Sequence, residues 1–224
     1  MTMVEMGGLM IEAAQPAAVA DFWRRALGGV ATGLTDGSVR VVGPHPTLVF
    51  SPQVRPKSVK NRVHFDTYVR SVDPLLAMGA RVLDEYLPTR VTLTDVDDNE
   101  FCAFLDPHAP VDPPARAFAV CTDSDRPEEL ASWWAGHVGA RIGDGSDGTP
   151  RWLYGVAGWR ELIWKFVRVG DERVVPNRWR WTVRADIAEL VATGAGAAEP
   201  GVLRDPQRNE FIVSERPAGS EGAR

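Results

Sequence analysis

The chain has 224 residues, 44% of them hydrophobic and 25% charged, and this composition predicts a globular protein of one large or two small domains. Its formal net charge is −5, from 25 Lys and Arg against 30 Asp and Glu. Binders of nucleic acids or anionic membranes need concentrated positive charge, so we expect neither partner and predict a small-molecule ligand. Lysine occurs only at positions 57, 60 and 165, which we attribute to base composition.

Targeting and cysteine signals are both weak. No stretch approaches the roughly 18 apolar residues that a membrane span requires, and residues 1–10 lack the basic start and apolar core of a signal peptide. We therefore expect a cytoplasmic protein.

Cys102 and Cys121 are too few for a disulfide framework and lie in apolar runs predicted as strands, so we expect buried free thiols.

The elements, taken in chain order, repeat one pattern four times. Each unit is a strand, a short helix that often ends at glycine, and two or three further strands. The predicted strands are 9–14, 39–42, 47–51, 63–69, 81–83, 90–94, 100–105, 116–122, 152–156, 161–167, 178–183, 201–203 and 210–214. The predicted helices are 16–27, 73–78, 125–137 and 185–193. The sequence thus predicts an α+β protein of four βαβββ units in mixed, mainly antiparallel sheets.

A longer repeat groups these units into two halves. Asn61-Arg-Val-His64 recurs as Asn177-Arg-Trp-Arg180, and Asp95 with Asn99-Glu-Phe recurs as Asp205 with Asn209-Glu-Phe, roughly 110 residues later. A proline-rich segment at 107–114 separates the halves. We predict domains at 1–107 and 115–216 and a disordered tail at 217–224.

The pattern resembles the vicinal oxygen chelate superfamily, in particular its glyoxalase-like branch, which includes bleomycin-resistance-type proteins. The resemblance rests on the βαβββ unit, on the segment 61–64, on Gly79-Ala80 after the second helix and on residues 95–101. It implies two glyoxalase-like domains with cup-shaped mixed sheets whose inner faces hold a small ligand. In metal-dependent members, His or Gln together with Glu, from the first and last strands of two paired units, chelates a divalent ion that holds substrate oxygens.

Carried onto this chain, the resemblance implies His64 and Glu100 as metal ligands, with Glu100 as the catalytic carboxylate. If the two halves exchange units, unit two faces unit three and Glu161 completes the set. A structural hydrogen-bonding role for each of these residues is the alternative.

The other units depart from that ligand pattern. The first offers only Met10 or Glu12 and Leu48 at these positions, and in the fourth Arg180 replaces the histidine although Glu210 remains. We expect any metal at the cup with His64, and an ion pair in the cup with Arg180.

Tryptophan is concentrated in the second half, which holds seven of the eight. Trp152, Trp164, Trp179 and Trp181, with Arg180, could line a pocket for a planar or cationic ligand, or pack in the core.

Two hypotheses for function stay open. One is a lyase, isomerase or dioxygenase that uses Zn, Ni, Mn or Fe at His64, Glu100 and Glu161. The other is a metal-free small-molecule binder of the drug-sequestering type, in which the tryptophans and Arg180 recognise the ligand. Because the tandem chain already supplies two facing halves, we expect a monomer, with at most a weak dimer through an exposed sheet edge.

Overall fold

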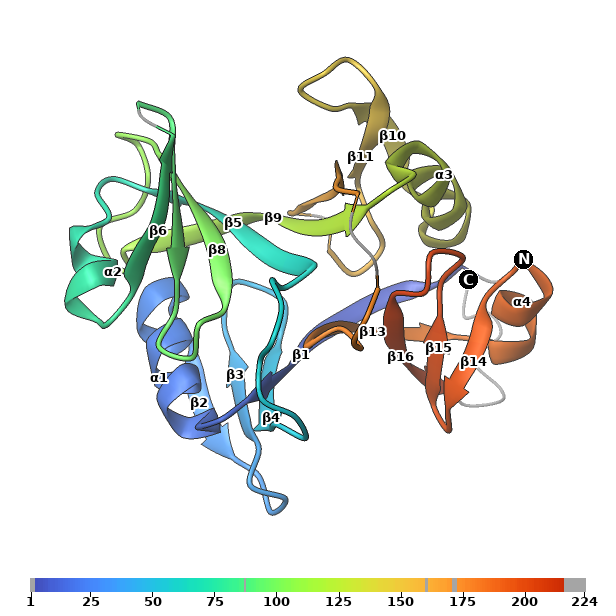
Figure 1. Ribbon diagram of the computed structural model, residues 1–224, viewed down its shortest axis with the longest axis horizontal. Helices are drawn as coiled ribbons and strands as arrows, with labels where there is room; N and C mark the ends of the chain where they lie inside the picture. Colours follow the sequence, from blue (N-terminus) through green and yellow to red (C-terminus); the bar gives the residue numbers. More distant parts are fainter. Residues whose placement is uncertain (1–2, 87, 160, 171–172, 216–224) are drawn as a thin grey trace, which may run out of the picture.

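The computed structural model describes residues 3–86, 88–159, 161–170 and 173–215, and these contain the four predicted βαβββ units (Figure 1). The first unit comprises β1 (Glu5–Ala13), α1 (Pro16–Leu27), β2 (Val30–Gly33), β3 (Val39–Val42) and β4 (Leu48–Pro52). The second comprises β5 (Val63–Val69), α2 (Asp73–Ala77), β6 (Arg81–Tyr86), β7 (Arg90–Thr94) and β8 (Glu100–Leu105). The third comprises β9 (Ala115–Ser124), α3 (Pro127–Val138), β10 (Arg141–Asp144), β11 (Pro150–Tyr154) and β12 (Ile163–Arg168). The fourth comprises β13 (Trp179–Ala185), α4 (Ile187–Ala192), β14 (Gly196–Glu199), β15 (Val202–Arg204) and β16 (Glu210–Glu215). The predicted tail at 217–224 lies outside the described residues.

Two eight-stranded mixed sheets carry these strands, and each sheet takes one unit from each half of the chain. The strand orders are β14-β15-β16-β13-β1-β4-β3-β2 and β10-β11-β12-β9-β5-β8-β7-β6. At the centres of the sheets, β1 pairs with β13 and β5 pairs with β9, both antiparallel. The halves therefore exchange units: unit two shares a sheet with unit three, and unit one with unit four.

Three strands escape the sequence prediction, namely β2, β10 and β14. Each has four residues and forms the outer edge of a sheet, and none has a buried residue. A strand that is exposed on both faces shows no alternation of apolar and polar residues, which is the signal that sequence analysis uses.

Among the described residues, no helix is long and apolar enough to cross a membrane.

The helices carry the tryptophans around which the core is packed. Trp23 on α1 packs edge-on against Phe101 and Trp179, with ring centroids 5.1 and 5.7 Å away. In the other half, Trp134 on α3 packs against Trp164, with ring centroids 4.9 Å apart. Such contacts add to the burial of large apolar surfaces.

The predicted aromatic pocket is therefore wrong for three of its four tryptophans. Trp164, Trp179 and Trp181 are at most 1% exposed and belong to the hydrophobic core. Side chains alternate between the two faces of a strand, so β13 directs both of its tryptophans into the core and Arg180 to the other face. Their spacing in the sequence is that of a core-facing strand.

A buried hydrogen-bond network explains the internal repeat. Asp95 accepts hydrogen bonds from the Trp23 indole at 2.9 Å and from the backbone and side chain of Asn99. The side-chain oxygen of Asn99 accepts a further hydrogen bond from the Asn61 side chain at 3.0 Å. The equivalent residues of the second half form the same network: Trp134, Asp205, Asn209 and Asn177. The repeated polar residues are thus structural, because they join the helix of one unit to the last turn of the next.

Candidate functional site

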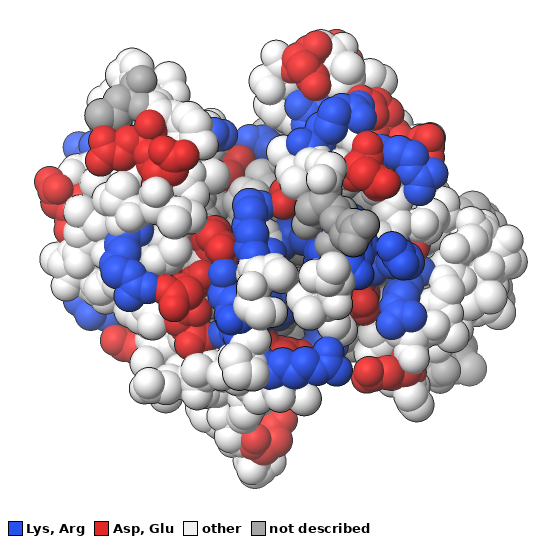
Figure 2. Space-filling view, viewed as in Figure 1, with Lys and Arg blue, Asp and Glu red and all other residues white. Residues whose placement is uncertain are grey.

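The candidate site is a cavity of about 650 Å³ in the sheet centred on β5 and β9, which we call the β5–β9 cup. Its floor consists of side chains from β5, β8, β9 and β12, and its walls come from the β6–β7 and β10–β11 hairpins. In Figure 2, Lys and Arg side chains gather in the hollow between the two halves of the molecule.

Strand alternation selects the residues of the floor. Along β5, Val63 and Phe65 join the core, whereas His64 and Asp66 face the cup. By the same rule, the neighbouring strands contribute a further set of polar side chains to the cup: Glu100, Cys102, Cys121, Asp123 and Lys165.

Lys165 is a buried cation on this floor. Its ammonium donates a hydrogen bond to Asp66 Oδ2 at 2.9 Å, and the two residues are 7% and 4% exposed. The same nitrogen lies 4.4 Å from the ring centroid of Phe118 and 4.8 Å from that of Trp152. A carboxylate and aromatic faces both attract positive charge.

His64 and the two cysteines carry no charge at neutral pH. Burial lowers the pKa of His64 below its ordinary 6.5, although the nearby Asp66 acts in the opposite direction. His64 Nε2 lies 4.0 Å from Cys102 Sγ and 3.8 Å from Asp66 Oδ1. Burial raises the pKa of Cys102 to about 11 and that of Cys121 well above 9.0. Both cysteines are free and buried, as predicted.

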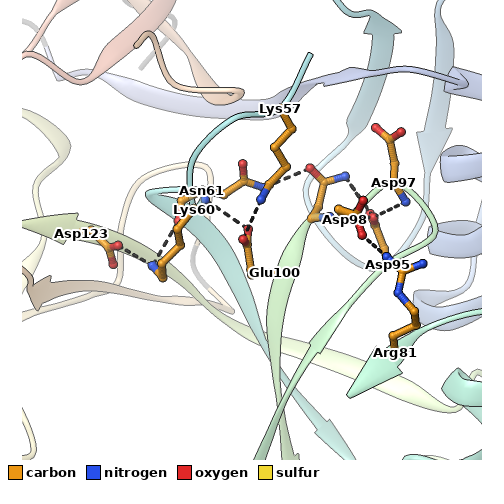
Figure 3. Close-up of polar contacts among 10 residues, drawn as sticks. Lys57, Lys60, Asn61, Arg81, Asp95, Asp97, Asp98, Glu100 and Asp123 are labelled. Atoms are coloured by element: carbon orange, nitrogen blue, oxygen red, sulfur yellow. Dashed lines mark hydrogen bonds and ion pairs between the residues drawn. The ribbon is translucent and has the colours of Figure 1, made fainter. Parts of the chain in front are cut away.

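Glu100 is committed to partners within the protein (Figure 3). One oxygen accepts a hydrogen bond from Lys57 Nζ at 2.7 Å, and the other accepts one from the backbone N–H of Asn61 at 3.1 Å. In the repeat, Glu210 accepts the backbone N–H of Asn177 at 2.9 Å. The glutamate of this motif therefore fastens the last strand of a unit to the start of its first strand, which is the structural alternative considered for it.

Glu161 does not join His64 and Glu100. It is exposed in the turn before β12 and lies outside the lining of the cup. The predicted strand at 161–167 begins only at Ile163, because the preceding turn takes up its first two residues.

β12 contributes Lys165, one of the three lysines, and Val167 to the cup. All three pair with carboxylates on the lining of the cup: Lys57 with Glu100, Lys60 with Asp123 and Lys165 with Asp66. Composition alone therefore does not account for these lysines.

The sheet centred on β1 and β13 contains ion pairs at the positions considered for ligands. Arg180 pairs with Glu12 at 2.8 Å, and Glu210 lies 3.5 Å from Arg204. Arg180 therefore neutralises a glutamate of the first unit rather than Glu210, because β1 and not β16 presents its carboxylate beside the guanidinium.

A metal ion fits the cup poorly as the side chains lie. Ligand atoms of His64, Asp66 and Cys102 do lie within 4.8 Å of one another, and nitrogen, oxygen and sulfur ligands of these kinds bind zinc. However, Asp66 is held by the ammonium of Lys165 at 2.9 Å, and a metal ion would have to displace this partner.

Two of these three clustered residues were missed by sequence analysis. Asp66 follows His64 by two positions and so shares its face of β5, a signal that the sequence contains. Cys102 lies two positions after Glu100 on β8 in the same way. The apolar residues around both cysteines predict only buried thiols in strands.

Comparison with known proteins establishes the family. The model of the glyoxalase-like domain family matches residues 8–104 and 119–219, so the chain belongs to this family and contains the domain twice. No curated protein was found to match the sequence.

Solved structures of the same fold include a glyoxalase and a putative dioxygenase. A mutant of glyoxalase I from Zea mays is 12% identical, with a TM-score of 0.61, over 95% of this chain and 94% of that one. A putative dioxygenase from Bacillus subtilis is 13% identical, also with a TM-score of 0.61, over 96% and 86% of the two chains. At this level of identity the likeness shows the fold alone.

Proposed function

We propose that the β5–β9 cup binds a small oxygenated organic molecule through the Lys165 ammonium, without a resident divalent metal. The observation that carries this proposal is the position of Lys165. Lys165 lies on β12, the last strand of unit three, where it pairs with Cys121 on β9. Cys121 in turn pairs with His64 on β5. The resemblance implies a metal ligand on the last strand of each paired unit, and here that strand carries a cation.

Electrostatics supports a ligand with a negatively charged oxygen, such as a carboxylate, phenolate or enolate. The Lys165 ammonium has three N–H donors and Asp66 accepts from one of them, so the others are available to such an oxygen, whereas Asp66 is already engaged and is not free to hold a divalent cation. The walls add Tyr86, Phe104 and Trp152, whose rings can cover the organic part of a ligand. The cavity volume lies in the usual range for small-molecule sites.

Benzoate, an aromatic carboxylate, is a direct probe of the cup. We expect saturable binding by calorimetry, with quenching of Trp152 fluorescence, and loss of at least about tenfold in affinity in Lys165→Met because a charge-assisted hydrogen bond is removed. Arg141→Met is the matched control, since Arg141 lies over the ring of Tyr154 outside the cup. Benzoate binding that is equal in wild type and Lys165→Met contradicts the proposal.

A metal-dependent function is the second candidate, and the convergence of His64, Asp66 and Cys102 favours it. Protein purified without a His-tag can be titrated with zinc, nickel, manganese and iron. We expect no stoichiometric uptake by the wild type, and uptake by Lys165→Met because Asp66 is then free. One equivalent bound by the wild type and lost in His64→Ala would replace the first proposal with the second.

We also propose that the chain acts as a monomer. Each sheet already combines units from both halves, so a second copy is not needed to complete either one. Light scattering at micromolar concentration tests this, and an obligate dimer would contradict it.

A further inference from the structure

A second cavity, of about 310 Å³, lies between the two segments that connect successive units, and we call it the linker cleft. One wall is formed by residues 54–62, between β4 and β5, and the other by residues 175–178, before β13. Glu12, Arg180 and Glu199 complete its lining. Among the described residues, only Lys60 lines both this cleft and the β5–β9 cup.

Positive charge is concentrated in the linker cleft. Two acidic side chains, Glu12 and Glu199, face six basic ones in the lining, and carboxylates outside the lining pair with three of the six, Lys57, Lys60 and Arg178. The basic residues of the lining are Arg55, Lys57, Lys60, Arg62, Arg178 and Arg180. This is unusual in a chain with a net charge of −5. A pocket lined in this way attracts anions.

The internal repeat places one guanidinium on each wall. Arg62 and Arg178 occupy the same position of the repeated Asn-Arg motif, and each reaches across to the opposite half of the chain. Arg62 Nη1 donates to the carbonyl of Val175 at 3.3 Å, and Arg178 Nη1 donates to Gln53 Oε1 at 3.0 Å. An anion in the cleft is therefore approached by arginines from both halves of the chain.

Several of these cations keep donor capacity for a ligand. Each guanidinium has five N–H donors; Arg178 gives two of its Nη–H groups to Gln53 and Asp97, and Arg180 gives one to Glu12 at 2.8 Å, so further Nη–H groups remain on both. The Arg178 side chain is only 9% exposed. Arg55 is exposed and forms no ion pair with any residue that the structure describes.

We propose that the linker cleft binds a small polyanion whose phosphate or carboxylate oxygens are held by Arg55, Arg178 and Arg180. The planar guanidinium donates two parallel hydrogen bonds to either kind of oxyanion, which makes arginine well suited to this recognition. The site is separate from the ligand site proposed for the β5–β9 cup.

Two lysines of the linker cleft are paired with carboxylates of the cup. Lys57 lines the cleft and pairs with Glu100, and Lys60 pairs with Asp123, and both of these carboxylates line the cup. An anion that draws either lysine toward the cleft weakens its pair and leaves a carboxylate free in the cup. The two sites are therefore joined by two ion pairs.

Calorimetry on the full chain tests the proposal, with pyrophosphate and citrate as probes that separate phosphate from carboxylate recognition. We expect saturable binding of at least one probe, weakened by added salt. Arg178→Gln and Arg55→Gln should each lower the affinity about tenfold or more. Arg184→Gln is the matched control, because this exposed arginine lies on the same strand as Arg180 but outside the cleft.

The outcomes are distinguishable from those for the cup. Lys165→Met should keep full affinity for the probe, because Lys165 does not line the cleft. Arg55→Gln changes an exposed loop residue, so the test holds even if Arg178→Gln fails to fold. No saturable binding of either probe, no effect of the two cleft variants, or an equal loss in Arg184→Gln overturns the proposal.

Discussion

Lys165 and Asp66 form an ion pair of 2.9 Å that joins unit three to unit two across 99 residues of sequence. Their side chains are 9% and 6% exposed, so both charges have given up most of their hydration. Such a pair contributes little compared with an apolar pair, but loss of one partner leaves the other charge buried and unpaired.

Lys165→Met should therefore lower the free energy of unfolding by about 3–5 kcal/mol. The double variant Lys165→Met/Asp66→Leu should recover most of this loss, because neither member of the pair is then left charged in the floor. Urea denaturation followed by tryptophan fluorescence measures both. A loss below about 1 kcal/mol in the single variant, the size expected for an exposed pair, would contradict the burial of this ion pair.

The two copies of the buried network should be equally sensitive to mutation. Asp95→Ala and Asp205→Ala each leave an indole N–H and several backbone and amide donors in the core without an acceptor. The cost is about 1–3 kcal/mol for each buried group. We expect both variants to be strongly destabilised in thermal unfolding. Asp36→Ala, which removes a carboxylate from an exposed turn, is the control. A large effect in one half only would show that the repeat does not have one structural role.

The fold was predictable because its signals are local. Alternation in the central strands, glycine after the helices and the repeated Asn-Glu-Phe segment each lie within a few residues. Three of the four edge strands, β2, β10 and β14, were not predicted, since exposure on both faces leaves no alternation, and the fourth, β6, was predicted only over its first three residues.

The candidate site was predictable only in part. His64 and Glu100 do line the cup, but the partner of each depends on segments distant in sequence. Lys165 reaches Asp66 only because unit three pairs with unit two, and Lys57 reaches Glu100 from a linker without regular structure. Nothing in the order of residues distinguishes Glu161, which is exposed, from Lys165, which is buried four positions later.

The thiols should be nearly inert in the folded protein. Alkylation requires the thiolate, and burial raises the pKa of Cys102 to about 11 while leaving the residue 8% exposed. At pH 8, iodoacetamide should modify neither cysteine until urea unfolds the chain, as intact mass spectrometry can follow. Rapid modification of Cys102 in the native protein would show that the thiol is ionised and open to solvent.

Stability should fall as the pH drops below about 6.5, and His64 should be one cause. Burial lowers its pKa in the folded state, so the unfolded chain takes up the proton first, at the ordinary value of 6.5. Between that value and the lower folded one, the unfolded state binds more protons, and the free energy of unfolding therefore decreases with falling pH, by at most about 1.4 kcal/mol per pH unit for one proton.

His64→Gln tests this assignment, because it keeps a polar side chain of similar length that does not titrate. Urea unfolding between pH 7.5 and 5, the range in which a histidine titrates, should give a shallower pH dependence for the variant than for the wild type. Some slope should remain, because burial also lowers the pKa of His137, and His64→Gln/His137→Gln should flatten the curve further. The comparison cancels the opposite contribution of Asp95 and Asp205, whose pKa values are raised by burial and whose protonation favours the folded state at lower pH. If the free energy of unfolding has the same pH dependence in wild type and His64→Gln, His64 has the same pKa in the cup as in the unfolded chain. That result would contradict the lowered pKa of His64 in the folded protein.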